Sequence, residues 1–487
     1  MSERLEDIIT NRKNKLEDIK KSGIDPYPSS ITRTHTNQQA LDGFDDLQGQ
    51  TISLVGRIRS WRDMGKIVFA HIEDGSGKIQ VLFKEGETEN FDFLIGHFDM
   101  GDFIEVTGTI FKTKTGEKTL QATSYKLLAK SLRPLPSEHF GLSDEETKLR
   151  KRYLDILTNP EAKEIFIKKN KFWSSFRKFL VDRGFLELEM PALEAVPGGA
   201  EAEPFITHHN ALDRDFYLRI SLELPLKKML VAGYEKVFEI GRIFRNEGIS
   251  SEHLQDYTQM EFYWAYGDFE KLMDLVQEMY QYVIQETFGT LQIPSFQGNI
   301  IDWSGNWPRL DYFELFQKHT DIDLNNTDEK ELKAYADKHK VKYEKFAGKG
   351  RLIDLIFKKT IRILPQVASQ PAFLINQPIE LEPLAKRDPK NPLAVQRFQI
   401  LACGSELGKG FGELNDPIDQ RSRFDDQMKL RDAGDNEAQM IDEDYVEAME
   451  YGMPPAAGFG ISERLFSVLM DKSIRETVVF PPMKSEK

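Results

Sequence analysis

The sequence predicts an α+β fold in which a small N-terminal β-barrel is followed by a larger domain built on an antiparallel sheet flanked by helices. Three stretches carry this prediction. Residues 51–130 contain five short strand-like runs separated by turns. Residues 162–184 have helical periodicity and end at a glycine, and residues 236–266 contain two strand-like runs joined by a polar loop.

Size and composition limit the classes of function. A chain of 487 residues with 40% hydrophobic content suggests two or three domains with sizeable cores. The single cysteine, Cys403, excludes a disulfide framework and a cysteine-based zinc site, and is typical of a reducing cytosol. The charged N-terminus has no apolar signal segment, and no run approaches the ~18 apolar residues of a membrane span. We therefore expect a cytoplasmic protein without membrane attachment.

Residues 1–50 are predicted to be an N-terminal helical extension and residues 51–145 a barrel. A Gly75-Ser76-Gly77 turn joins the second and third of the five strands, a pattern typical of an OB-fold. Such barrels bind single-stranded nucleic acid by stacking bases on exposed aromatic rings. The net charge of −14 argues against coating of nucleic acid by the whole surface, but RNA binding needs only a local basic face.

Residues 146–160 are highly charged and follow a Pro-rich stretch, which predicts a hinge between domains. Residues 161–487 then form the second domain. It opens with a helix rich in aromatic residues and a strand that ends at Pro191. Residues from about 305 to 370 alternate charged helices with short apolar runs, and we expect a small helical insertion to which the sequence assigns no chemistry.

The second domain is expected to centre on residues 236–266. The run from 236 to 244 is rich in apolar residues, and the run from 259 to 264 alternates polar and apolar residues. The two runs therefore indicate antiparallel strands whose polar face, with Glu261, looks into a site. Taken alone, the same pattern fits an ordinary surface hairpin with charged residues.

The residues of this segment resemble a known family. F-R-N-E-G at 244–248, followed by T-Q-M-E-F-Y at 258–263, resembles motif 2 of class II aminoacyl-tRNA synthetases, in the form found in lysyl-tRNA synthetases of the bacterial type. The resemblance extends over nearly the whole chain. It implies that the helix and strand before Pro191 are motif 1, which forms a homodimer interface, and that G-F-G-I-S-E-R at 458–464 is motif 3.

The family resemblance implies an ATP site. By this resemblance Arg245 bridges the amino-acid carboxylate and the α-phosphate, a role that suits a permanently charged, bidentate guanidinium. Glu247 accepts from the adenine amino group, and His253 lies near the phosphates. Tyr257 and Arg464 stack on the two faces of adenine.

The resemblance also implies a pocket for the cationic side chain of L-lysine, because an ammonium is costly to bury unpaired. It implies that Glu413 and Tyr263 hold the ε-ammonium and that Glu261 adds negative charge. The remaining residues implied to bind lysine either pack its methylene groups or surround its backbone groups; they are Phe411, Gly199, Glu223 and Lys409.

Three positions depart from the family pattern. Glu406 matches a carboxylate that coordinates Mg²⁺, but Gln399 stands where the family has a second metal carboxylate, and an amide brings no charge. Lys409 stands where the family has an asparagine; it either pairs with the substrate carboxylate or reaches Glu413 and competes with the incoming ammonium. Motif 3 is one residue short and carries Ser462-Glu463 where Gly and Asp are common.

The barrel resembles the anticodon-binding domain of the same enzymes. Residue matching implies that Phe69 stacks on a central anticodon uridine and that Arg62, Gln80 and Glu117 bind its edge, which offers carbonyl acceptors and an N–H donor. Without the resemblance, an aromatic residue of the barrel core is the better interpretation of Phe69.

The resemblance implies ATP- and Mg²⁺-dependent attachment of lysine to the lysine tRNA through a lysyl-adenylate. Two alternatives stay open. A protein-lysine ligase belongs to a related group that lacks the barrel. A catalytically degraded, tRNA-binding relative is suggested by the departures at Gln399 and Lys409.

Overall fold

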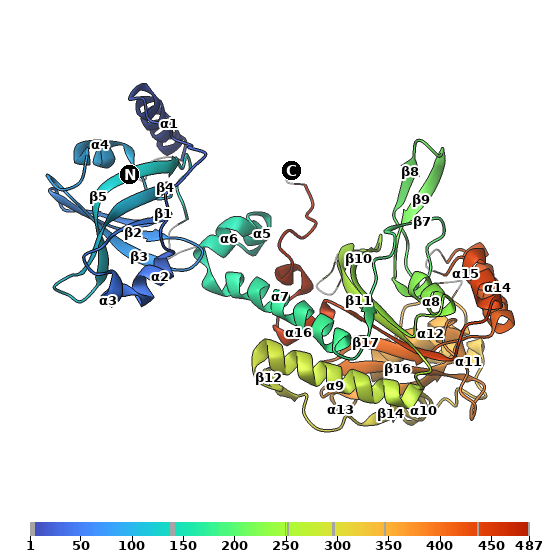
Figure 1. Cartoon of the computed structure of the whole chain (residues 1–487). Helices are drawn as coiled ribbons and strands as arrows, with labels where there is room; N and C mark the ends of the chain where they lie inside the picture. The colour runs from blue at the N-terminus through green and yellow to red at the C-terminus, as the bar shows by residue number, and fades with distance from the viewer. Residues whose placement is uncertain are drawn as a thin grey trace. The chain divides into compact units, whose positions relative to one another are not determined.

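The computed structural model describes residues 5–136, 142–248, 250, 253–294, 298–344, 347–435 and 438–485. Its contacts divide the chain into two compact units, Met1–Leu142 and Ser143–Lys487. Figure 1 shows the elements of both units. No helix in the described ranges has the length and apolar character needed to cross a membrane.

The first unit is a closed five-stranded barrel with the strand order β1-β2-β3-β5-β4, which confirms the predicted OB-fold. Alternate residues of β2 face its core: Val68, Ala70 and Ile72 are fully buried, whereas Phe69 and His71 are only partly buried. The elements of the barrel are β1 (Thr51–Asp63), β2 (Ile67–Glu73), β3 (Lys78–Lys84), α4 (Phe91–His97), β4 (Phe103–Lys112) and β5 (Lys118–Ala129).

Residues before the barrel are packed against it and are not a separate extension. Ile19 of α1 (Leu5–Lys21), Ala40 of α2 (Asn37–Asp42) and Phe44 of α3 (Phe44–Leu47) belong to the barrel's hydrophobic core. The predicted helix is present, and the C-terminal part of its apolar stripe, Leu16 and Ile19, is buried, whereas Leu5 at its start is exposed.

The second unit is organised on an eight-stranded sheet, antiparallel at its centre and parallel at its two edge pairs. β10 and β11 pair in antiparallel register, so the predicted hairpin is confirmed as part of this sheet. In order across the sheet, the strands are β14 (Arg309–Asp311), β15 (Ala372–Pro378), β16 (Ala394–Ala402), β17 (Ser405–Gly412), β18 (Ala456–Ser462), β11 (Asp256–Ala265), β10 (Lys236–Phe244) and β6 (Leu186–Glu187).

Two groups of helices cover opposite faces of this sheet. Met260 and Phe262 of β11 share a core with α7 (Pro160–Val181), α9 (Phe269–Phe288) and α16 (Arg464–Leu469). Tyr263, of opposite parity, packs with α8 (Glu223–Val231), α14 (Pro417–Asp432) and α15 (Glu443–Glu450). Figure 1 shows α7 and α9 on one side of the strands and α8, α14 and α15 on another.

The region predicted as a hinge is helical. Residues 145–158 form α5 (Glu145–Arg150) and α6 (Arg152–Thr158), and both belong to the second unit. Buried Arg152 pairs with Asp155 at 2.8 Å and donates to the backbone oxygen of Glu476 at 3.1 Å. These contacts hold the charged segment against the C-terminal part of the chain, within the second unit.

The predicted insertion has a core of its own, but it starts later than expected, because residues 309–311 form strand β14 of the main sheet. Its elements are α10 (Tyr312–Thr320), α11 (Glu329–Lys338), α12 (Lys349–Ile356), a π-helical turn (Phe357–Ile361) and α13 (Pro365–Ala368). The remaining elements are a small sheet of β7 (Leu193–Glu194), β9 (Arg214–Leu218) and β8 (Ile206–His209), the pair β12 (Gln292–Pro294) and β13 (Ile300–Asp302), and 3-10 turns at Ile379–Leu381 and Ile474–Thr477.

A buried carboxylate links α7 to the end of β18. Glu463 is fully buried, accepts from the Thr258 amide at 2.7 Å and pairs with Lys169 of α7. Glu463→Gln keeps an acceptor for Thr258 but leaves Lys169 without its carboxylate. Breaking a buried pair costs about 3 kcal/mol, so calorimetry should show the second unit unfolding roughly 5 °C lower.

The control is Asp182→Asn, which removes the exposed pair between Lys178 and Asp182. An exposed pair contributes at most about 1 kcal/mol, so this variant should unfold near the wild-type temperature. Equal shifts for the two variants would contradict the structural role of Glu463.

Candidate functional site

A cavity of about 270 Å³ lies over the central strands of the second unit. Most residues that the sequence singled out for the ATP and amino-acid sites line it: Gly199, Glu223, Arg245, Tyr257, Glu261, Tyr263, Gln399, Glu406, Lys409, Phe411 and Arg464. Glu247, His253 and Glu413 are outside this lining. The sheet thus brings together residues separated by more than 200 positions.

Strand register explains how the floor of the cavity is built. One row of cross-strand neighbours is Glu261, Gly460, Lys409 and Gln399; the next is Tyr263, Gly458, Phe411 and Arg397. In both rows the central strand β18 contributes a glycine. The functional side chains on either side therefore stand around a gap that a bulkier residue would fill.

Glu261 is a buried carboxylate held by neutral donors. Its Oε1 accepts from Ser221 Oγ at 2.7 Å and from the Leu222 amide at 3.2 Å, and its Oε2 accepts from the Tyr263 hydroxyl at 2.8 Å. Among the described residues no lysine, arginine or histidine forms an ion pair with it. The group is fixed in position and adds negative charge to the cavity.

Glu413 lies just behind the cavity floor. A Cβ at Gly458 would come within 2.2 Å of Glu413 Oε1 and 2.5 Å of the Tyr263 ring, so the glycine makes room for the carboxylate. Oε1 is buried and accepts no hydrogen bond from the described part of the chain. Oε2 instead pairs with Lys227, a fully buried residue of α8.

Lys227 also pairs with Glu223, one helical turn before it, at 2.6 Å. Burial raises the pKa of Glu223 to about 7 and raises that of Glu413, while the charge of Lys227 opposes both shifts. These carboxylates are therefore poised to lose protons when a further cation arrives.

Lys409 does not pair with Glu413, the protein partner considered from the sequence. Its Nζ lies 3.2 Å from Glu382 Oε2, and Arg397 lies 3.6 Å from the same oxygen. Burial alone would raise the pKa of Glu382, but the two cations lower it. Lys409 thus neutralises a carboxylate of the cavity wall and leaves Glu413 to Lys227.

Aromatic and guanidinium groups gather at the other end of the cavity. Arg245 donates from Nε to the Ile220 carbonyl at 3.2 Å, and its guanidinium lies 5.8 Å from the centre of the Tyr257 ring. Arg464 Nη2 lies 3.4 Å from His253 Nε2. Glu247 is close enough to Tyr257 to affect its pKa, which burial raises. The backbone oxygen of Glu247 accepts from Gln255 at 3.2 Å.

Glu406 can serve as a carboxylate ligand of Mg²⁺. Although burial would raise its pKa, Lys358, Arg362 and Arg397 lower it, so it is ionised. It already accepts from Arg362 Nη1 at 2.8 Å and from the Gln399 amide nitrogen at 3.0 Å. The described residues contain no cluster of three or more metal-binding side chains. Mg²⁺ is commonly held by one or two carboxylates with substrate phosphates, and this donor set fits that arrangement with Glu406 alone.

The placement of the shortened motif 3 is resolved. Glu463 points away from the cavity to Lys169 and Thr258, whereas its neighbour Arg464 lines the cavity. Glu463 is therefore a structural residue, and the change from the family pattern at 462–463 does not remove Arg464 from the site.

The four residues expected to read an anticodon lie close together on the barrel. Arg62 and Phe69 are direct cross-strand neighbours, and Gln80 donates to Glu117 at 2.7 Å. Phe69 faces away from the core, which removes the alternative that it is a core aromatic. His71, which the sequence analysis did not single out, lies 2.9 Å from Glu117 through Nε2.

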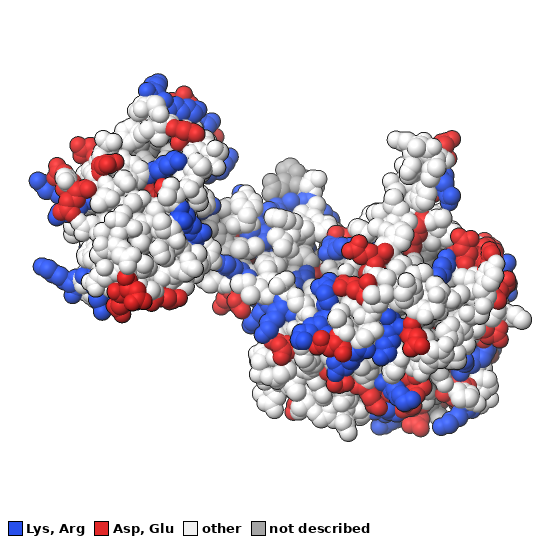
Figure 2. Space-filling model, in the orientation of Figure 1, with Lys and Arg blue, Asp and Glu red and all other residues white. Residues whose placement is uncertain are grey.

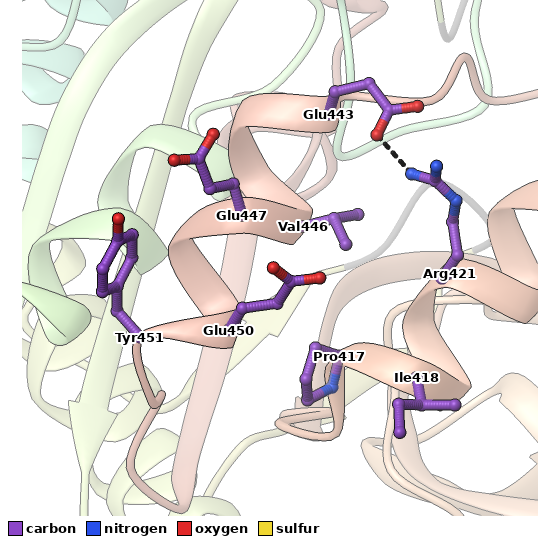
Figure 3. A pocket seen from close by; sticks show the side chains of 8 residues that line it. All are labelled: Pro417, Ile418, Arg421, Glu443, Val446, Glu447, Glu450 and Tyr451. Atoms are coloured by element: carbon purple, nitrogen blue, oxygen red, sulfur yellow. Dashed lines mark hydrogen bonds and ion pairs between the residues drawn. The ribbon is translucent and has the colours of Figure 1, made fainter.

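A second pocket, of about 730 Å³, lies between α14 and α15 (Figure 3). Its lining includes the ion pair of Arg421 with Glu443 and the exposed side chains of Ile418 and Tyr451. None of the residues singled out from the sequence lines it. On the face shown in Figure 2, acidic and basic side chains are interspersed on the surface of each unit.

Five residues of these sites were missed in the sequence: Lys227, Arg362, Glu382, Arg397 and His71. A spacing of four from Glu223 was the only signal for Lys227. Arg362 comes from the helical insertion, to which the sequence assigned no chemistry.

Comparison with known proteins gives consistent matches. Residues 144–484 match the family described as tRNA synthetases class II (D, K and N), and residues 52–128 match the OB-fold nucleic acid binding domain. The chain is 44% identical to a lysine–tRNA ligase of Pelotomaculum thermopropionicum, over 99% of this chain and 96% of that protein. It is 43% identical to the lysine–tRNA ligase of Carboxydothermus hydrogenoformans and 40% identical to that of Bacillus subtilis, in both cases over 99% of this chain and 98% of the relative.

Proposed function

Because this chain belongs to the class II tRNA synthetases (D, K and N), we propose that it activates L-lysine with ATP and transfers it to the lysine tRNA. The observation that carries the choice of amino acid is the buried Glu413 Oε1, which accepts no hydrogen bond from the described residues and lies beneath Gly458 of the cavity floor. An unsatisfied carboxylate oxygen in that position attracts a cation.

The lysine substrate is held at both ends. Its ε-ammonium pairs with Glu413 and contacts the Tyr263 hydroxyl, while Glu261 adds negative charge behind that tyrosine. Its methylene groups pack on Phe411. The α-ammonium pairs with Glu223 beside Gly199, where a Cβ would come within 2.8 Å of Glu223. Lys409 stays on Glu382 and borders the pocket without entering it.

Activation depends on positioning and charge neutralisation. Arg245 holds the substrate carboxylate near the α-phosphate, and Tyr257 and Arg464 clamp the adenine, with His253 near the phosphates and Glu247 near the adenine amino group. A carboxylate oxygen attacks the α-phosphorus and pyrophosphate leaves; a terminal ribose hydroxyl of the tRNA then attacks the carbonyl carbon and AMP leaves. Mg²⁺, for which Glu406 is the candidate ligand and Gln399 a neutral neighbour, neutralises phosphate charge when bound.

The OB-fold barrel is proposed to recognise the anticodon. Phe69 offers an outward-facing ring for stacking, and Arg62, Gln80 and Glu117 offer donors and acceptors beside it. The barrel also argues against a protein-lysine ligase, which has no use for an anticodon reader.

We also propose that the protein acts as a homodimer in the cytoplasm, where tRNA is charged. Strand β6 is a short edge strand of the main sheet, and its Leu186 is 45% exposed. Ile167 of α7 is 54% exposed. Apolar groups exposed on an edge strand and a neighbouring helix suit an interface. Sedimentation at micromolar concentration tests this assembly.

The central test is lysine-stimulated exchange of pyrophosphate into ATP. Gly458→Ala should displace the Glu413 carboxylate and the Tyr263 ring, and should raise the KM for lysine about 10- to 100-fold, as for loss of a charged hydrogen bond of about 1.5–3 kcal/mol. Gly96→Ala is the control, because Gly96 lies on α4 of the barrel and its Cβ would meet no atom within 4 Å.

Stimulation of the wild type by another amino acid, with none by lysine, would overturn the substrate assignment. Normal tRNA binding without any exchange would favour the catalytically degraded alternative.

Lysine affinity should fall as the pH is lowered from 8 to 6. Below its raised pKa of about 7, Glu223 is protonated in the free protein and must lose that proton before it pairs with an ammonium. One such group gives about a tenfold rise in Kd between pH 8 and pH 6. Titration calorimetry measures it; Glu223→Gln should bind more weakly and with a shallower pH dependence. A flat wild-type profile would contradict the proposed pairing.

Phe69→Ala should impair tRNA charging without affecting adenylate formation. Loss of one stacked base costs about 1–3 kcal/mol, so the KM for tRNA should rise roughly 10- to 100-fold while lysine-stimulated exchange is unchanged. Phe69→Tyr keeps the ring and should charge tRNA like the wild type. Equal charging by all three proteins would place recognition elsewhere.

A further inference from the structure

A lysine of the protein itself lies against the proposed pocket. Lys227 is completely buried, and its Nζ pairs with Glu223 at 2.6 Å and with Glu413. The same Nζ lies 5.3 Å from the centre of the Phe411 ring and 5.8 Å from that of Tyr263. These four partners are the residues assigned above to the substrate, so one primary ammonium already occupies their outer side.

Lys227 stands behind the cavity. It is not among the cavity-lining residues, whereas Glu223, Tyr263, Phe411 and Gly458 are. Glu413 is likewise outside the lining: its Oε2 pairs with Lys227, and its Oε1 lies beneath Gly458. Lys227 thus holds one oxygen of Glu413 and leaves the other without a partner among the described residues.

The charges of the groups around the pocket indicate a role for Lys227. Glu223, Glu261 and Glu413 bring three negative charges when ionised, and Lys227 brings one positive charge. Glu382 has two cations of its own, Lys409 and Arg397, and Glu201 of the cavity lining lies near that group. Within the set of Glu223, Glu261, Glu413 and Lys227 the balance is two negative charges, and L-lysine carries two ammonium groups in addition to the carboxylate assigned to Arg245.

Resting on the function proposed above, we propose that Lys227 is a resident counter-cation of the lysine pocket. It neutralises one of three buried carboxylates, so that two charges remain for the two substrate ammonium groups, and it orients Glu413 so that Oε1 faces the substrate. Lys227 is thus a positioning residue that sets the charge specificity of the pocket without touching the substrate.

The neighbours of Lys227 come from several elements. Glu223 lies on its own helix, and Tyr445 on α15 is close enough for its pKa to depend on the charge of Lys227. The groups that act electrostatically on Lys227 or on its carboxylate neighbours are Glu223, Glu261, Tyr263, Glu382, Lys409, Glu413 and Tyr445. Further charged and titratable groups of the cavity lining are Glu201, Arg245, Tyr257, Arg397, Glu406 and Arg464. Removing the cation from this set raises the proton affinity of the carboxylates.

The test is lysine binding to the full-length protein between pH 6.5 and 9, measured by titration calorimetry. Lys227→Met should move the midpoint of the pH profile upward by about one unit from its wild-type position near 7, which raises the Kd at pH 7.5 roughly threefold. The ratio of its Kd to the wild-type Kd at the same pH should fall towards one at pH 9, which loss of packing alone would not produce. The KM for ATP should be unchanged.

Two further variants and a control keep the test decisive. Lys227→Gln retains a donor for the buried carboxylates but not the charge, so it should fold even where Met does not, and it should show the same upward midpoint. Lys227→Arg retains the charge and should keep the wild-type midpoint. Lys228→Met, which removes a partly exposed neighbour paired with Asp442 at 3.4 Å, should leave both affinity and midpoint unchanged.

Tighter lysine binding by Lys227→Met would overturn the proposal, because Lys227 would then be a competitor for the ammonium site. An unmoved midpoint in both Lys227→Met and Lys227→Gln would overturn it as well. In either case wild-type lysine binding preserves the proposed function, whereas a wild type that binds no lysine removes both.

Discussion

Burial of charge is the constraint on which the second unit depends. A carboxylate taken out of water needs a cation or several donors, and most buried carboxylates of this unit have a cation: Arg219 for Glu239, Arg152 for Asp155, Lys409 for Glu382 and Lys169 for Glu463. The cavity is the exception. Glu261 has only neutral donors, and Glu413 has one cation on one oxygen. This excess of buried negative charge lies where a substrate cation is expected. The pairing of buried carboxylates with cations therefore stabilises the interior, and its incompleteness at the cavity locates the site.

Much of the fold could be predicted because it follows from local patterns. Alternation along β11 set its two faces correctly, with Glu261 towards the cavity and Met260 in the core. The five barrel strands were likewise readable from turns and β-branched residues. The charged segment at 146–160 has a contact that local patterns do not reveal: Arg152 is buried and donates to the backbone oxygen of Glu476. No local pattern reports such a contact.

In the site, too, local sequence patterns predicted the strand faces but not the contacts between distant segments. From the sequence, Lys409 was considered as a partner of the substrate carboxylate or as a competitor for Glu413. In the folded chain Lys409 pairs with Glu382, from a loop whose position the sequence did not fix, and Glu413 pairs with Lys227. Strand parity gives the face of the sheet but not the partner, because partners come from segments that cross that face.

The departures at Gln399 and Lys409 are adjacent in space, since the two residues are direct neighbours across β16 and β17. Relative to the family pattern, one position loses a negative charge and the other gains a positive one. The added cation has Glu382 beside it, and the Gln399 amide donates to Glu406. Gln399 lies beside the candidate metal ligand Glu406, whereas Lys409 lies on the amino-acid side, with its Nζ 5.7 Å from the centre of the Phe411 ring. Because Lys409 pairs with Glu382 and Glu413 pairs with Lys227, the added cation does not occupy the carboxylate assigned to the substrate ammonium.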